Sequence, residues 1–220
     1  MTRGELARLL DHSVLRPEST ETDILAGADL VREWGIGFYC VQSSFVSVAA
    51  AALEGSGARV VSVVGFPHGC ARSVVKVQEA TLAVQDGAAE VDMVLNIGKL
   101  KSGRSQAAAS EIAQVVRAVP GTPVKVILEN CLLREDEKVV ACRLVRDAGA
   151  AFVKTSTGFD SRGGATVADV RLMRATVGPD FGVKAAGGIR TLADAMAMLD
   201  AGANRIGTSA SVAILAALSS

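Results

Sequence analysis

Residues 147–157, DAGAAFVKTST, join a glycine-containing turn to a short apolar strand. The same plan recurs in DGAAEVDMVLN at 86–96 and in DAGANRIGTSA at 200–210, and EWGIGFYCVQ at 33–42 is a looser copy. In each segment the glycine can end a helix in the left-handed backbone conformation, and a strand follows directly. Repetition of one helix–turn–strand unit predicts successive βα modules around a parallel sheet.

Eight short runs rich in apolar or β-branched residues are predicted to be strands, and helical patterns separate them. The strands are expected near residues 11–15, 36–41, 59–65, 90–95, 124–129, 151–156, 182–186 and 204–208. The helices are expected near residues 20–34, 44–54, 71–86, 104–118, 134–148, 166–177, 191–201 and 209–217. This alternation predicts one α/β domain over residues 1–220, a closed (β/α)8 TIM barrel with a short N-terminal helix. An open doubly wound sheet is the alternative, but no GxGxxG turn follows the first strand.

The composition excludes several classes of protein. Lys plus Arg equals Asp plus Glu at 23 each, so no basic excess points to nucleic acid or to an anionic membrane. No apolar run approaches the ~18 residues of a membrane span, and the N-terminus lacks a signal-peptide pattern. The four cysteines are scattered without metal-ligand spacing. A cytoplasmic protein with no metal and no nucleic-acid or membrane partner is therefore expected.

Charged residues occupy one face of several predicted strands. Alternate side chains of a barrel strand face the interior and the helices. By this alternation Asp92 lies opposite the apolar face of its strand, Lys125 shares a face with Glu129, and Lys154 and Lys184 lie on matching faces of neighbouring strands. The charged faces of four strands therefore point into the barrel. One interpretation is a purely structural ion-pair network, because buried charges are costly unless they are paired.

The second interpretation is catalytic. A lysine amine is a nucleophile only when it is neutral, and its ordinary pKa is about 10.4. Burial and a second nearby cation both lower that pKa, so Lys154 and Lys184 together suit Schiff-base formation with a carbonyl substrate. Asp92 can accept and donate the proton. This chemistry requires no cofactor, and none is expected.

Glycine-rich turns follow the last predicted strands. AAGGIR, residues 185–190, precedes one helix, and RIGTSAS, residues 205–211, precedes the final helix. Backbone N–H groups at a helix N-terminus favour anions, and barrels frequently bind phosphate at the loops after strands seven and eight. Ordinary turn chemistry is the alternative for any one of these glycines. Together the two turns favour a phosphate-bearing substrate.

An ordered set of motifs carries a resemblance over essentially the whole chain. The motifs are LLDHSVLRP (9–17), VVGFPHG (63–69), EVDMVLNIG (90–98), VKVILE (124–129), FVKTSTGF (152–159), GVKAAGGIRT (182–191) and RIGTS (205–209). Because it contains these motifs in this order, the chain resembles the 2-deoxyribose-5-phosphate aldolase family, whose members are class I aldolases that form a Schiff base. The barrel fold of that family agrees with the strand pattern.

The resemblance implies a role for each matching residue. Lys154 would form the Schiff base, Lys184 would tune it, and Asp92 would be the acid/base carboxylate. Contacts to substrate or phosphate are implied for Gly158, Gly187, Gly188, Gly207, Ser209, Asp11 and Cys40.

The implied reaction is the reversible cleavage of 2-deoxy-D-ribose 5-phosphate to acetaldehyde and D-glyceraldehyde 3-phosphate, in the breakdown of deoxyribose phosphates. The partners would be these sugar phosphate and aldehyde substrates, together with further copies of the chain in a dimer or tetramer. A transaldolase-like Schiff-base barrel and a non-catalytic sugar-phosphate-binding barrel remain the alternatives.

Three segments depart from the usual family pattern. CVQSS at 40–44 stands where CVNP is usual, LENC at 128–131 replaces IET, and Ala210 stands where a second serine is common. None of these removes a proposed catalytic group. Cys40 itself could be a reactive thiol or a small buried hydrophobic residue.

Overall fold

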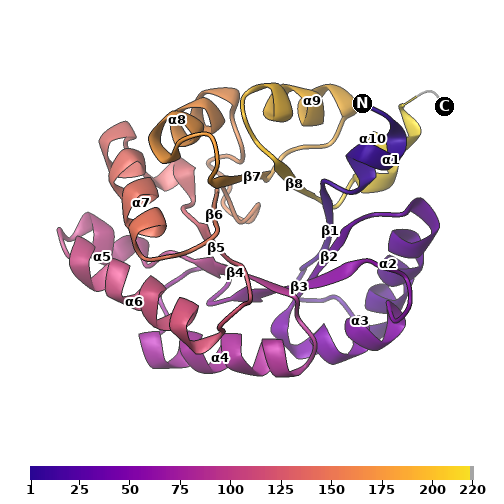
Figure 1. Ribbon diagram of the computed structural model, residues 1–220, viewed down its shortest axis with the longest axis horizontal. Coiled ribbons are helices and arrows are strands. Elements are labelled where there is room, and N and C mark those ends of the chain that lie inside the picture. The colour runs from indigo at the N-terminus through magenta and orange to yellow at the C-terminus, as the bar shows by residue number, and fades with distance from the viewer. Residues whose placement is uncertain (219–220) are drawn as a thin grey trace.

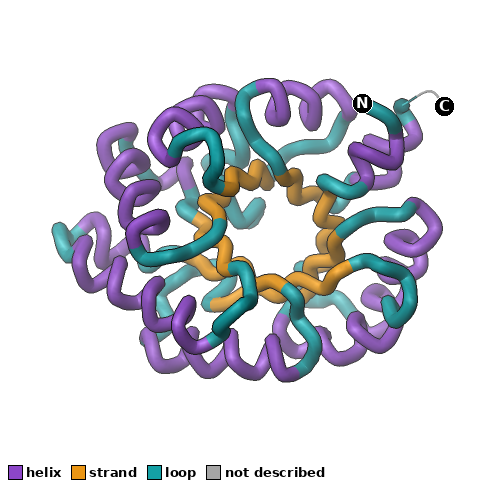
Figure 2. The backbone as a smooth tube through the Cα atoms, in the orientation of Figure 1, coloured by secondary structure: helices purple, strands orange, loops and turns teal. Residues whose placement is uncertain are grey.

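A computed structural model of the chain describes residues 1–218, so the last two residues of the expected domain lie outside the described part. Eight parallel strands close into a barrel in chain order, with β1 paired to β8 (Figure 1, Figure 2). The strands are β1 (Leu10–Val14), β2 (Phe38–Val41), β3 (Arg59–Val64), β4 (Glu90–Val94), β5 (Val124–Ile127), β6 (Phe152–Lys154), β7 (Gly182–Ala186) and β8 (Arg205–Thr208). The predicted (β/α)8 barrel is confirmed, and the open-sheet alternative is wrong.

Helices surround the barrel on all sides (Figure 2). They are α1 (Arg3–Ala7), α2 (Glu21–Trp34), α3 (Val46–Ala52), α4 (Ser73–Gln85), α5 (Ile97–Lys101), α6 (Ser105–Ala118), α7 (Glu135–Asp147), α8 (Val167–Val177), α9 (Leu192–Asp200) and α10 (Ser211–Ala216), with 3-10 turns η1 (Ser43–Phe45) and η2 (Asn130–Leu132). The short N-terminal helix is present as α1, beside α10 (Figure 1). No helix within residues 1–218 has the length and apolar character needed to cross a bilayer.

Local sequence signals set the ends of the helices. The Thr20 hydroxyl accepts from the N–H of Asp23, whose carboxylate accepts from Thr20 in return, so α2 begins with a capping box. Gly35 closes α2 with a φ of 61°. Gly149 and Gly202, the turn glycines of two of the quoted repeats, also have positive φ. The repeated glycines therefore end helices, as the sequence predicts.

Two differences from the predicted elements have local causes. The short helix α5 was not expected, and it forms because the Asn96 side chain accepts a hydrogen bond from the N–H of Lys99 at 3.1 Å. Strand β6 ends at Lys154 rather than near residue 156. Past that point the Thr155 hydroxyl bonds the backbone of Ala186 in both directions at 3.0 Å, replacing part of the strand ladder.

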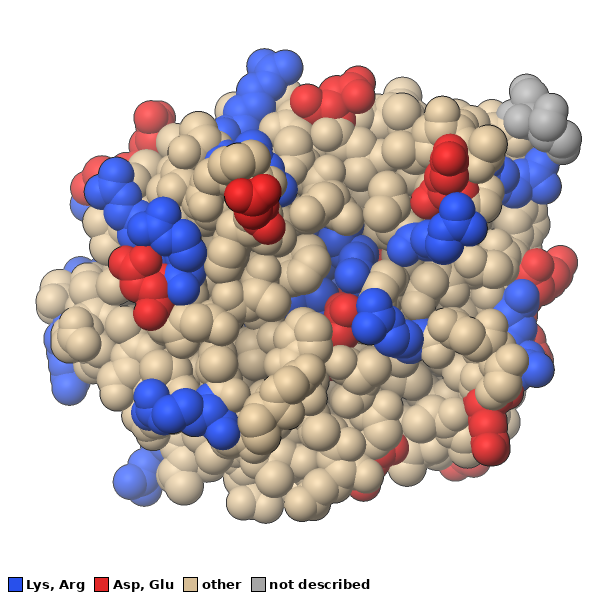
Figure 3. All heavy atoms as spheres, viewed as in Figure 1, with Lys and Arg blue, Asp and Glu red and all other residues tan. Residues whose placement is uncertain are grey.

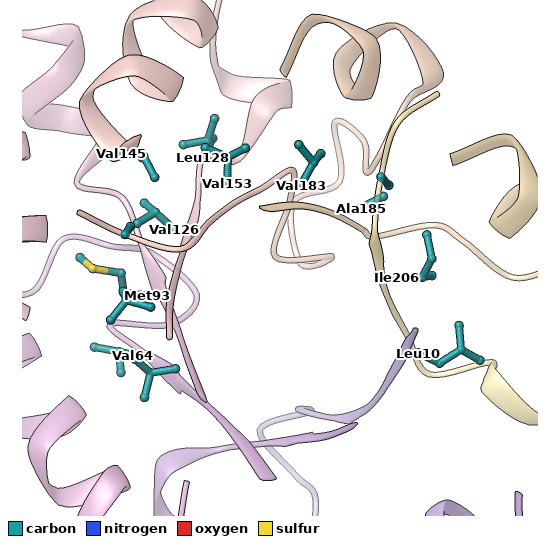
Figure 4. Close-up of a cluster of buried hydrophobic side chains, with 14 of the residues drawn as sticks. Leu10, Val64, Met93, Val126, Leu128, Val145, Val153, Val183, Ala185 and Ile206 are labelled. Carbon is teal, nitrogen blue, oxygen red and sulfur yellow. The ribbon is translucent and has the colours of Figure 1, made fainter. Parts of the chain in front are cut away.

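An apolar layer between strands and helices holds the barrel. Outward-facing side chains such as Val126, Val153, Val183 and Ile206 point away from the barrel interior toward the helices (Figure 4). All four are fully buried, so this layer removes a large apolar area from water. The sides of the strands that face the helices are apolar, and the charged residues of the strands face the barrel interior.

Strand register brings the interior charges together. Lys154 of β6 is paired with Lys184 of β7, and Lys184 is paired in turn with Arg205 of β8. Asp92 of β4 is paired with Lys125 of β5. Neighbouring strands lie about 4.8 Å apart. When two paired residues point to the same side of the sheet, their side chains are therefore within contact distance.

Candidate active site

A cavity of about 690 Å³ opens at the carboxyl ends of the strands. Figure 3 shows a hollow at the centre of one face, with Lys and Arg atoms inside it. Of the residues proposed from the sequence, the cavity wall contains Lys154, Lys184, Asp11, Cys40, Gly158, Gly187, Gly188, Gly207 and Ser209. Asp92 lies beneath the lysines, fully buried, and contacts both of them. The structure thus brings all of these positions to one place, and their roles are proposed below.

Asp92 is the centre of the interior network. One of its carboxylate oxygens, Oδ2, accepts hydrogen bonds from Lys154 Nζ and from Lys184 Nζ, each at 2.7 Å. The other, Oδ1, accepts from Lys125 Nζ at 2.7 Å. Burial raises the pKa of the Asp92 carboxyl, but these three lysines outweigh burial and hold the pKa well below its ordinary value. Asp92 is therefore an anion in the resting protein.

Lys184 is held by a second carboxylate as well. Its Nζ also donates to Asp11, which in turn accepts from Arg205 Nη1 at 3.0 Å. Burial alone lowers the pKa of the Lys184 ammonium, but the charges of Asp11 and Asp92 reverse that effect and raise it above the ordinary value. Lys184 is therefore a permanent cation whose ammonium group shares an acceptor with Lys154.

Glu90 completes the network on the side away from the cavity. Its carboxylate lies 2.6 Å from Lys125 Nζ and 3.1 Å from Arg205 Nη1. Within residues 1–218 the buried groups joined by ion pairs are three carboxylates and four cations: Asp11, Glu90 and Asp92 with Lys125, Lys154, Lys184 and Arg205. The half-exposed Arg59 adds a further cation 3.7 Å from Glu90. Each buried charge of the network therefore has a partner, as buried charges require.

Gly164 and Gly187 are explained by close backbone packing between two loops, whereas Gly158 is explained by its φ of 85°. A Cβ on Gly187 would lie 3.1 Å from the Cα of Gly164 and 3.3 Å from that of Gly158. A Cβ on Gly164 would lie 2.2 Å from the carbonyl oxygen of Gly187. The β6–α8 and β7–α9 loops thus pack backbone against backbone at the cavity wall, which only glycine permits.

Gly207 lies within β8 rather than in a turn. It pairs with Asp11 and Ala186 on the neighbouring strands. A Cβ there would lie 3.1 Å from Cε of Lys184, so the absent side chain leaves the room that the lysine occupies. This contact explains the glycine without reference to phosphate.

The helix that follows AAGGIR is already capped. The carboxylate of Asp194 accepts from the N–H groups of Arg190 and Thr191 at 3.1 and 2.9 Å. The N–H of Asp194 also donates to the Thr191 hydroxyl at 3.1 Å, which completes the capping box of α9. These three N–H groups are therefore occupied within the protein, whereas the Gly187–Gly188 backbone lines the cavity. Ser209 lies exposed at the cavity wall, ahead of the short helix α10.

Cys40 faces the interior from β2 and is 1 % exposed. Burial and the nearby Asp92 charge raise the pKa of its thiol to about 11. It packs with Phe38, Val61 and Val63 in an apolar cluster inside the barrel. Of these four residues, only Cys40 lines the cavity, and its raised pKa makes it an inert thiol there.

Several residues of this site have no role that the sequence pattern predicts. The pattern places Lys125 in the barrel interior without a role, and it predicts Arg205 only as part of a turn. Gln42, from the departing CVQSS segment, donates to the carbonyl oxygens of Leu15 and Arg16 at 3.1 and 2.7 Å. These bonds hold the β1–α2 loop, part of which lines the cavity. The family pattern does not predict this role of Gln42, because the usual pattern has no glutamine at that position.

The fold and the site define a (β/α)8-barrel enzyme whose cavity lies at the carboxyl ends of the strands. The sequence profile of the family described as DeoC/LacD family aldolase matches residues 7–217, and the chain belongs to that family.

Proteins named deoxyribose-phosphate aldolase are similar over nearly the full length. Those of Streptococcus pneumoniae serotype 19F and Streptococcus sanguinis are 53% and 52% identical over 211 residues, covering 96% of each chain. A solved putative deoxyribose-phosphate aldolase from Coccidioides immitis is 38% identical with a TM-score of 0.95, covering 98% of this chain and 86% of its own. The tetrameric enzyme of Aeropyrum pernix is 32% identical with a TM-score of 0.90, covering 98% and 91%. The family resemblance seen in the sequence is confirmed.

Proposed function

We propose that this protein is a class I aldolase that reversibly cleaves 2-deoxy-D-ribose 5-phosphate to acetaldehyde and D-glyceraldehyde 3-phosphate, with Lys154 as the Schiff-base lysine. The observation that carries the proposal is the contact of Lys154 and Lys184 with one oxygen of Asp92 at the cavity floor. The names of the full-length relatives support this choice of substrate.

Lys154 is the lysine of this network that is best placed to be the nucleophile. Lys184 stays charged because Asp11 and Asp92 neutralise it in part, and Lys125 adds a further cation on the far oxygen of Asp92. Of the cations bound to Asp92 within residues 1–218, only Lys154 both lines the cavity and lacks a second ion-paired carboxylate. Its amine can therefore reach a substrate carbonyl, and its reaction breaks one ion pair rather than two.

The neutral amine attacks the C1 aldehyde of the open-chain sugar, and loss of water gives an iminium. Removal of the proton from the C3 hydroxyl breaks the C2–C3 bond, and the electron pair passes to the iminium to give an enamine. Glyceraldehyde 3-phosphate leaves, the enamine is protonated at C2, and hydrolysis releases acetaldehyde and the lysine. The iminium is the electron sink of the reaction.

Asp92 is the candidate carrier of these protons. In the resting protein three lysines hold its pKa down, which makes it a weak base. Its pKa rises once Lys154 gives up its proton, because one of the three cations has then gone. Asp92 would thus become a competent acid and base only while the reaction is under way.

The substrate phosphate is assigned to the far end of the cavity. Gly158, Gly187 and Gly188 present backbone there, with Ser209 on the adjoining edge, whereas Gly207 lies beside Lys184 and would meet the substrate nearer the lysines. Binding at a distance from the reacting carbons orients the sugar over Lys154. Asp11 and Cys40 contribute to the wall nearer the lysines.

The setting of the reaction is part of the proposal. We infer a cytoplasmic enzyme of deoxyribose phosphate breakdown that has no nucleic-acid or membrane partner. It would form a homo-oligomer, a dimer or a tetramer, and the tetrameric relative from Aeropyrum pernix supports this.

Trapping with sodium borohydride in the presence of acetaldehyde tests the mechanism. We expect intact-mass analysis to show one reductive ethylation and peptide mapping to place it on Lys154. Lys154→Ala should abolish the adduct, whereas Lys138→Ala, which removes an ion-paired lysine outside the cavity, should retain it. An adduct that survives Lys154→Ala contradicts the proposal.

Substrate specificity separates the alternatives. Cleavage of deoxyribose 5-phosphate without turnover of ketose phosphates supports the proposed aldolase. The reverse preference indicates a transaldolase-like enzyme, and sugar-phosphate binding without an adduct or turnover indicates a non-catalytic barrel.

A further inference from the structure

Glu129 has a backbone conformation that side chains rarely adopt. Its φ is 53° and its ψ is 65°, and among residues 1–218 no other non-glycine residue has a positive φ. Such a conformation costs of order 1 kcal/mol or more and persists where the surrounding structure enforces it. The residue lies in LENC, where the flanking residues Leu128 and Asn130 depart from the usual IET but the glutamate is retained.

Hydrogen bonds to the end of β6, the strand that contains the proposed nucleophile Lys154, enforce this conformation. The N–H of Leu128 donates to the carbonyl of Lys154 at 2.9 Å, and the N–H of Asn130 donates to the carbonyl of Thr155 at 3.0 Å. The residues on either side of Glu129 are therefore bonded to two successive carbonyl groups, those of Lys154 and Thr155. Its strained backbone is tied directly to the end of β6.

The side chain of Glu129 is a buried carboxylate with no direct ion pair. It is 4 % exposed, and none of the ion pairs within residues 1–218 includes it. Burial raises the pKa of its carboxyl, although hydrogen bonds from Thr157 and the charge of Lys154 oppose that effect. A buried carboxylate without a direct ion pair is unfavourable for stability, and such groups are concentrated at functional sites.

The hydrogen bonds from nitrogen and oxygen donors to the carboxylate come from the turn after Lys154. Thr157 donates its hydroxyl to Oε2, and its N–H lies 3.3 Å from both carboxylate oxygens. The same hydroxyl accepts from the N–H of Phe159 at 3.0 Å. A weak contact from Cys131 Sγ at 3.9 Å is the other interaction. The carboxylate thus fixes the whole turn 157–159.

This turn forms part of the cavity wall. Thr157, Gly158 and Phe159 all line the cavity, and Gly158 packs against the backbone of Gly187. The ring of Phe159 also meets Phe66 of the β3–α4 loop edge to face, with 5.1 Å between centroids. A shift of the turn would move both the Gly158–Gly187 contact and the aromatic contact.

We infer that Glu129 is a positioning residue that holds the Thr157–Phe159 turn against the Gly187 loop and thereby sets the affinity for the phosphate-bearing end of the substrate. The inference rests on the proposed function, because it assigns that end to the glycine loops. Glu129 contacts no reacting atom and acts through Thr157.

The test compares substrates with and without phosphate. In Glu129→Gln the KM for 2-deoxyribose 5-phosphate should rise about tenfold or more, as expected for weakening of charge-assisted hydrogen bonds. The KM for unphosphorylated 2-deoxyribose and the trapping of acetaldehyde on Lys154 should change less than about threefold. Thr157→Val should reproduce the effect, and Thr157→Ser should restore near-normal KM.

A double-mutant cycle and a control variant distinguish positioning from general destabilisation. Glu129→Gln combined with Thr157→Val should give a KM close to that of either single variant, because both remove one interaction. Glu137→Gln, which alters a carboxylate that caps α7 away from the cavity, should leave both KM values unchanged.

Equal losses for the two substrates, additive effects in the cycle, or unchanged KM values would overturn the inference. The proposed function stands in each of those cases, provided that the unaltered protein cleaves deoxyribose 5-phosphate and is trapped on Lys154. If Glu129→Gln fails to fold, Thr157→Val and Thr157→Ser decide the matter alone.

Discussion

Lys154 and Lys184 donate to the same oxygen of Asp92, each at 2.7 Å, although 30 residues of chain separate them. Their strands are adjacent and in register, so the two ammonium groups lie on one acceptor. Lys184 has the additional carboxylate of Asp11 and keeps its charge. This asymmetry assigns different roles to two lysines with similar sequence surroundings.

Replacement of Lys184 by leucine should move the activity to higher pH. Without the fixed cation the amine of Lys154 holds its proton more strongly, so the pH–rate profile should shift upward by about 1 to 2 units. Turnover near pH 7 should fall about 10- to 100-fold as a result. The measurement is kcat/KM from pH 5 to 10, with Lys138→Leu as the control for loss of a paired lysine elsewhere. A profile that stays in place contradicts the tuning role.

Asp92→Asn should destabilise the protein as well as inactivate it. Removal of the shared anion leaves Lys125, Lys154 and Lys184 facing each other, and breaking a buried pair costs about 3 to 5 kcal/mol. Urea unfolding at pH 7 measures this loss. A change below about 1 kcal/mol would show that the cations lose their charge at little cost.

The acid dependence of stability provides a second measurement on the same variant. The folded pKa of Asp92 lies below its ordinary value of 3.8, so its contribution to stability is complete above that value. The contribution disappears as pH falls through the folded pKa. Asp92→Asn should therefore flatten the decline in the free energy of unfolding below about pH 4.

Gly207→Ala should impair catalysis more than stability. The added methyl group would lie 3.1 Å from Cε of Lys184 and 3.0 Å from Cβ of Ala186, so the flexible lysine is expected to shift. We expect kcat to fall about tenfold or more, since small displacements of positioned groups are costly. Gly98→Ala adds the same methyl group on α5, where its nearest neighbour is 3.7 Å away, and should retain activity. Equal kcat values for the two variants would rule out the role of Gly207 in making room for Lys184.

Alkylation should distinguish the exposed and buried cysteines. Cys70 is exposed, whereas Cys40 is buried with a thiol pKa raised to about 11. Iodoacetamide at pH 8 should label Cys70 in the native protein and leave Cys40 unmodified until denaturant is added. Peptide mapping over time measures the order. Early labelling of Cys40 would restore the alternative of a reactive thiol.

Much of the site could be predicted because strand alternation is a local property. The opposite facing of Asp92 and Met93 follows from the pleat alone, and so does the inward direction of Lys154 and Lys184. The role of Gln42 is harder to predict, because Gln42 lies where the sequence departs from the family pattern. The effect of Glu129 depends on a backbone conformation that no residue preference indicates.

Neighbouring residues of the chain determine the order of the helices and strands. They also determine the face on which each side chain lies and the capping of the helices. The charge pairing is different, because it depends on which strands become neighbours. Asp11 reaches Lys184 across 173 residues only when the barrel closes and places β1 beside β8. Closure also makes Asp92 the shared anion of three lysines. Sequence periodicity specifies which way a side chain faces, whereas register and closure specify what it meets there.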